Sequence, residues 1–176
     1  MTPIPDLRRT IIDAWRTNAL VTTRFVEQLP TELWDAPMPS IPRRTIRTTA
    51  SHLHNARTRW IRTLGSEHGI RAPQLVPRSV TKRAVLVALK RSALGIEALL
   101  ALGIAEGGQL PPSKAYVWRN LPLDVGHVLT YFVAHEAHHR GQVVLAARQL
   151  GQRLPAEVVN GLWQFATRSR ELRGAP

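Results

Sequence analysis

The sequence predicts an all-α fold, a four-helix bundle with an additional C-terminal helix, and three observations carry that prediction. Apolar residues recur at helical spacing along most of the 176 residues. Segments rich in proline and glycine separate four long amphipathic stretches. No stretch shows a convincing strand pattern, although a short extended piece is expected around residues 115–119. This length suits a single domain over residues 1–176 with a real hydrophobic core.

Proline and glycine mark the limits of the expected helices. The first helix ends at Pro30, the second at Gly65, and Gly151 caps the fourth. Pro155 lies close to the start of the last helix, where proline is well tolerated. We expect an up-down-up-down order for the four long helices, although two of the connections between them are long enough to permit another order. The expected helices cover residues 5–29, 45–64, 80–104, 123–150 and 154–172.

Composition narrows the classes of function. Cysteine is absent, which excludes disulfides, thiolate metal sites and cysteine nucleophiles. The formal net charge is +12, but the arginines are scattered along the chain, so solvated helix faces explain them better than nucleic-acid binding does. The first residues lack the apolar core of a signal peptide, and the most apolar stretch is interrupted by charges. We therefore expect a cytoplasmic protein without a membrane partner.

The stretch AHEAHHRGQ lies on the fourth expected helix and holds the clearest candidate site. At about 100° per residue, His135 and His139 fall in the middle of the apolar stripe that should face the bundle core. Two imidazoles four residues apart can reach one ion, and a metal would offset the cost of burying them. This pair therefore predicts a metal site. The whole stripe consists of Val125, Val128, Phe132, His135, His139, Val143, Ala146 and Leu150.

A first-row metal usually needs at least three protein ligands. The second expected helix offers His52 and His54, which flank its apolar face on opposite sides by similar angles. Helical periodicity cannot choose between these two histidines.

The same stretch also matches H-E-x-x-H, the short zinc-peptidase pattern. A peptidase would use Glu136 as general base and a third ligand downstream, where Glu157 is the plausible carboxylate. Glu157 stands in the first turn of a short helix, where an acid simply complements the helix dipole. No sheet is expected to bind a peptide substrate. We therefore rank a metallopeptidase below the other functions.

Two motifs tie the sequence to a known family. The segment YFVAHEAHHRGQVVLAARQLG resembles the last bundle helix of the DinB/YfiT-like superfamily, which typically contains H-x-x-x-H-R-G-Q. The segment HLHNARTRW resembles the histidine-containing helix of that family, in which a histidine precedes a tryptophan by eight residues. By this resemblance, the metal ligands are His52, His135 and His139. The resemblance covers most of the chain in helix order.

The resemblance implies a DinB-like four-helix bundle, often a homodimer, that binds a divalent metal, usually zinc or nickel. Some relatives transfer groups or isomerise substrates with low-molecular-weight thiols, and many have no known activity. We therefore expect a metal-dependent thiol transferase or hydrolase acting on a small molecule. The alternative is a non-catalytic bundle that binds a metal and a small ligand. A basic nucleic-acid-associated protein is a third, less favoured hypothesis.

Neighbours of the histidine pair suggest further roles. Tyr131 and Gln142 lie on the flank of the ligand stripe, where they could support the ligands or a cofactor. Glu136 lies on the opposite flank and has two open roles, either a base for a catalytic step or a partner for arginines of the second helix. Arg140 points about 100° away from His139, so packing is at least as good an explanation for it as substrate binding.

Overall fold

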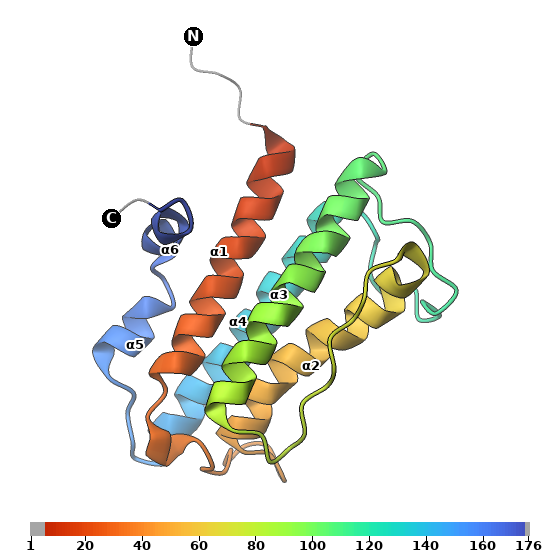
Figure 1. Cartoon of the computed structure of the whole chain (residues 1–176). Helices are drawn as coiled ribbons and strands as arrows, with labels where there is room; N and C mark the ends of the chain where they lie inside the picture. Colours follow the sequence, from red (N-terminus) through yellow and green to blue (C-terminus); the bar gives the residue numbers. More distant parts are fainter. Residues whose placement is uncertain (1–5, 175–176) are drawn as a thin grey trace.

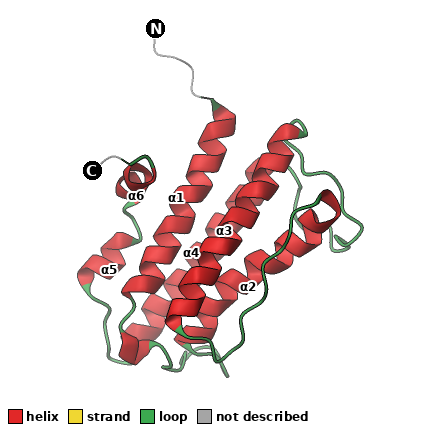
Figure 2. Cartoon of the chain, viewed as in Figure 1, coloured by secondary structure: helices red, strands yellow, loops and turns green. Residues whose placement is uncertain are grey.

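The computed structural model describes residues 6–174. Figure 2 shows that these residues form helices and loops only, which confirms the predicted all-α class. Residues 115–119 belong to a loop rather than an extended strand. The long helices are α1 (Leu7–Gln28), α2 (Ile46–Gly65), α3 (Lys82–Ala105) and α4 (Val125–Gln149). The short ones are η1 (Thr31–Leu33), η2 (Ser66–His68), α5 (Ala156–Gly161) and α6 (Phe165–Leu172). Figure 1 shows the long helices packed side by side, with α5 and α6 along one flank.

Each long helix begins at a side chain that accepts a hydrogen bond from its first turn. Asp6 caps α1, Thr81 caps α3 and Asp124 caps α4. Thr45 caps α2 through a reciprocal pair of bonds with Thr48. These local bonds place the helix starts within about two residues of the predicted ones.

The direction of the helices differs from the predicted up-down-up-down order. One apolar cluster holds residues from the end of α1 and α4 but from the start of α2 and α3. A second cluster holds the opposite ends of the same helices. Hence α2 and α3 run parallel to each other and antiparallel to α1 and α4, as the colours of Figure 1 show.

The connection from α2 to α3 explains this correction. Its residues 69–80 form an extended loop that returns along the bundle, as Figure 1 shows. At about 3.3 Å per residue such a loop can span the roughly 30 Å of α2, whereas a short turn would have forced α3 to run antiparallel. Loop length alone did not reveal which of these two paths the chain takes.

The predicted single C-terminal helix is two short helices. Gln164 has ψ 46°, outside the helical range, and separates α5 from α6. Both short helices pack against α1, so the break allows the chain to follow the curved surface of the bundle. Within the described residues, no helix is both long and apolar enough to cross a membrane.

Candidate metal centre

Three histidines from two helices converge near the middle of the bundle. His135 and His139 stand one turn apart on α4, and their Nε2 atoms are 3.1 Å apart. The ring of His52 on α2 lies 5.3 Å from that of His135 and 4.6 Å from that of His139, centroid to centroid. One nitrogen from each of the three lies within 4.8 Å of the other two. The structure therefore brings together the three residues that the family resemblance selected.

The distance between His135 and His139 and the protonation of all three histidines fit a metal ion. Ions such as Zn²⁺ bind imidazole nitrogen at about 2.0–2.1 Å, which sets ligand nitrogens roughly 3–3.4 Å apart. Burial and the neighbouring histidines lower the pKa of His52 and His135 to about 4, well below the ordinary value of 6.5. Burial also lowers the pKa of His139. At neutral pH all three imidazoles are thus uncharged, which is the form that binds metals.

Gln142 orients one of the three rings. Its Oε1 lies 2.8 Å from Nδ1 of His139, so a proton on Nδ1 donates to the amide and leaves Nε2 facing the other histidines. The amide nitrogen of Gln142 bonds to Nε2 of His138 at 2.8 Å. His138 is not one of the three grouped histidines, but it contacts His139 both through Gln142 and directly, with ring centroids 5.1 Å apart.

Tyr131 supports a second ring. It stacks on His135 at a centroid distance of 5.8 Å and an interplanar angle of 16°. Its hydroxyl accepts a hydrogen bond of 3.1 Å from the indole nitrogen of Trp60 on α2. Tyr131 and Trp60 thus restrict the orientation of the His135 ring by contacts that join α4 to α2.

Glu136 does not join the histidine group. Its Oε1 accepts a hydrogen bond from Nε of Arg57 at 2.6 Å. Its Oε2 accepts from Thr22 at 2.6 Å and from Asn18 at 2.9 Å. Burial opposes ionisation of Glu136, but the charge and hydrogen bond of Arg57 outweigh it and hold the pKa below its ordinary value. Of the two roles left open, this geometry favours the partner of an arginine from α2.

Sequence reasoning missed most of this buried polar network. Arg57 lies in the apolar stripe of α2, four residues after Leu53, and an arginine at a core position was the available clue. Its guanidinium lies 4.9 Å from the ring centre of Trp15. Arg140 is buried as well and donates to Thr22, which agrees with a packing role.

The remaining candidate ligands lie apart from the group. His54 is completely buried, and its Nε2 lies 2.8 Å from the carbonyl oxygen of Gln74. This histidine serves the core, so tertiary contacts resolve the choice between His52 and His54. Glu157 is exposed in the first turn of α5 and is not part of the three-donor group. The third candidate ligand is therefore His52 on α2, which precedes the H-E-x-x-H segment in the chain. The peptidase pattern would place this ligand after that segment.

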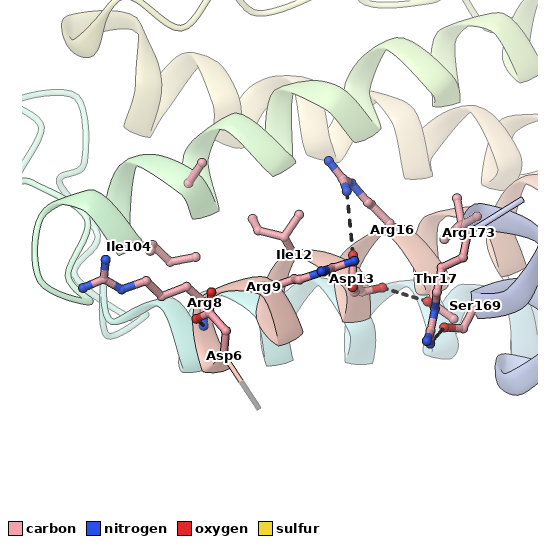
Figure 3. Close-up of a pocket in the computed structure, with 12 residues that line it drawn as sticks. Asp6, Arg8, Arg9, Ile12, Asp13, Arg16, Thr17, Ile104, Ser169 and Arg173 are labelled. Atoms are coloured by element: carbon pink, nitrogen blue, oxygen red, sulfur yellow. Dashed lines mark hydrogen bonds and ion pairs between the residues drawn. The ribbon is translucent and has the colours of Figure 1, made fainter. Parts of the chain in front are cut away.

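Two cavities differ in their relation to the histidines. One cavity of about 770 Å³ is lined by residues of α1, α3 and α6. Figure 3 shows its wall, in which Asp6 and Asp13 lie among arginines. A cavity of about 410 Å³ lies against α2, and His52 forms part of its wall. Only the second therefore adjoins the candidate metal centre.

The fold and site together define a helical bundle with a three-histidine group that could hold a metal ion. A comparison with family models gives the closer assignment, because the DinB family model matches residues 6–166. The chain belongs to the DinB family. No curated protein matches it.

Proposed function

We propose that this protein binds a divalent metal ion, zinc or nickel, through His52, His135 and His139. The observation that carries the proposal is the convergence of three uncharged imidazoles within 4.8 Å of one another. A metal ion bound by three protein nitrogens keeps an open coordination position for a substrate, so a fourth protein ligand is not required. Homodimerisation and a cytoplasmic location stay predictions.

We further propose that the bound ion activates a small thiol or a water molecule toward an electrophilic substrate. Three neutral ligands leave a divalent ion its full charge, and such an ion acts as a Lewis acid that lowers the pKa of a neighbouring thiol or water. Gln142 orients His139, and Tyr131 orients His135. The small cavity beside His52 provides a path for the substrate.

A non-catalytic bundle that binds a metal and a small ligand is the second candidate. The observation in its favour is that, in the described part of the chain, no carboxylate makes a hydrogen bond or ion pair with the three histidines. Glu136 is engaged elsewhere, so it is poorly placed to accept a proton from a ligand at the histidines. Neither a thiol nor a water molecule that the ion has already ionised would need such a base, so this observation counts only against chemistry that depends on a carboxylate as general base.

Metal analysis of the purified protein tests the binding proposal. We expect about one ion per chain in the parent protein, with loss in His52→Ala, His135→Ala and His139→Ala. His127→Ala is the matched control, because His127 is exposed on the same helix as two of the ligands. Circular dichroism checks that each variant stays helical. Stoichiometric metal in all three ligand variants would rule the site out.

Turnover tests the enzymatic proposal separately. The metal-loaded and metal-free proteins would be assayed for conjugation of several cofactor thiols to a panel of electrophiles, and for ester and amide hydrolysis. Metal-dependent turnover that disappears in His135→Ala supports an enzyme. Metal binding without turnover across the panel would favour the binding module.

A further inference from the structure

We propose that the cavity beside His52 binds the anionic end of a small molecule, a phosphate or a cluster of carboxylates, and presents the rest of that molecule to the metal centre. The statement that the ligand reaches a metal centre rests on the proposed function. The anion site itself does not depend on that function. The anion site follows from the shape, charge and rigidity of the cavity.

The cavity has the size of a small-molecule site and walls from three segments. It measures about 410 Å³, within the range of pockets that take metabolites. The loop between α1 and α2, the helix α2 from Thr48 to Arg59 and the loop between α2 and α3 each contribute to it. The lining residues are Pro42, Arg43, Arg44, Thr48, Ser51, His52, Asn55, Arg59, Val76, Pro77 and Arg78.

The charge of this cavity is uncompensated. Arg43, Arg44, Arg59 and Arg78 line it, and none of its lining residues is acidic. Across the described residues, none of these four arginines forms an ion pair. Arg44 is half-buried, and Arg43, Arg59 and Arg78 are exposed at the cavity. Positive groups that line one concave surface without an acidic partner raise the local concentration of anions.

The cavity in Figure 3 provides the contrast. There Asp6 and Asp13 line the wall together with the arginines. Arg16 in that cavity pairs with Glu97 at 2.6 Å. Acidic residues of the protein thus offset part of the positive charge in this cavity, whereas the cavity beside His52 has no acidic residue in its wall.

Contacts between the two loops hold the cavity in shape. Arg78 donates a hydrogen bond of 2.7 Å to the carbonyl oxygen of Arg43, which ties the loops together. Asn55 bonds both the N–H and the carbonyl of Val76, at 2.9 and 3.1 Å. Arg43 adopts φ 62°, a left-handed conformation that is costly for an arginine and that recurs at binding sites. A site held in shape before binding loses less entropy when a ligand enters.

His52 links the cavity to the histidine group, because it belongs to both. Arg44 and Arg59 line the same cavity wall as His52. An anion held by these arginines therefore lies beside the histidine group. The ligand class that fits is a small molecule with an anionic group at one end and its reactive group at the other.

Calorimetric titration of the full chain tests this proposal, with inorganic phosphate and succinate as separate probes. We expect saturable binding of at least one probe, and the stronger probe distinguishes a phosphate ligand from a carboxylate one. Arg44→Gln and Arg59→Gln should each weaken binding about tenfold, because each removes charge-assisted hydrogen bonds. Arg8→Gln and Arg153→Gln remove the same charge elsewhere and should leave binding unchanged.

Metal content, measured on the same samples, separates this proposal from the metal proposal. The Arg44→Gln and Arg59→Gln variants should keep the metal content of the parent protein, and His135→Ala should keep anion binding. If the parent protein binds the anion but contains no metal, the metal site is refuted and the anion site stands. Absence of saturable binding for both probes, or equal weakening in the control variants, overturns the anion site. Binding of oligonucleotides but of neither probe also overturns it.

Discussion

Nε of Arg57 on α2 lies 2.6 Å from Oε1 of Glu136 on α4, and both side chains are 1% exposed. Thr22 and Asn18 of α1 complete the contacts of the carboxylate. Nη1 of Arg57 also donates a hydrogen bond of 3.0 Å to the carbonyl oxygen of Leu89 on α3. This polar layer therefore joins all four long helices and lies between the two apolar clusters of the core. These contacts give Glu136 a structural role, although it stands in an H-E-x-x-H pattern.

Glu136→Gln should destabilise the protein strongly. The change leaves the buried charges of Arg57 and Arg140 uncompensated, and breaking a buried ion pair costs about 3–5 kcal/mol. Urea denaturation measures the change in the free energy of unfolding. Glu27→Gln is the control, because Glu27 pairs with Arg24 on the surface and should contribute less than about 1 kcal/mol. Equal effects in the two variants would contradict a structural role for the buried pair.

The metal-free protein should lose stability as the pH falls from about 6.5 to about 4.5. His52 and His135 have a pKa of about 4 in the folded state and 6.5 as ordinary histidines, because burial disfavours their charged form. In this window the unfolded state binds protons that the folded state does not, so protonation favours unfolding. Glu136 contributes mainly below its ordinary pKa of 4.5.

Urea denaturation at a series of pH values measures this slope. The double variant His52→Ala and His135→Ala should show a shallower slope over the same window. An unchanged slope would mean that these two imidazoles titrate normally in the folded protein.

Gln142→Ala should weaken metal binding without abolishing it. The amide bonds Nδ1 of His139 at 2.8 Å, and loss of such a supporting bond typically costs about 10–100-fold in metal affinity. Competition with a chromophoric chelator measures the affinity. Gln149→Ala is the control, since Gln149 lies at the far end of α4 and bonds Ser40. An affinity equal to that of the parent protein would show that the amide does not position His139.

Two glycines in helices should respond oppositely to replacement by alanine. Gly141→Ala should stabilise α4 by about 0.5–1 kcal/mol, because an added Cβ meets nothing within 4 Å. Gly95→Ala should destabilise the protein, because the new Cβ would lie 2.5 Å from Cδ1 of Ile61 on α2. Thermal denaturation of both variants checks the opposite signs. A loss of stability in Gly141→Ala would indicate a contact with a partner molecule at this position.

Local patterns predicted the helices well, since caps and breakers act within a few residues of the chain. Thr45 and Asp124 bond to groups three residues away, so their effect is visible in the sequence. The failed expectations depended on distant contacts. The path of the α2–α3 loop and the break at Gln164 both follow from packing against other helices.

For the candidate metal centre, too, local features could be predicted from the sequence, whereas features made by several segments could not. By itself the sequence determined the pair of His135 and His139, because one helix holds both and its period places them on one face. Helical periodicity did not separate His52 from His54, since their angles to the apolar stripe of α2 are similar. The family resemblance selected His52, and the tertiary structure places His52 beside the pair on α4 while His54 bonds to the carbonyl oxygen of Gln74. The tertiary structure also assigned Glu136 to Arg57 and gathered four arginines around one cavity. Helix periodicity reports which face a residue occupies, whereas a site made from several segments depends on how those faces are brought together.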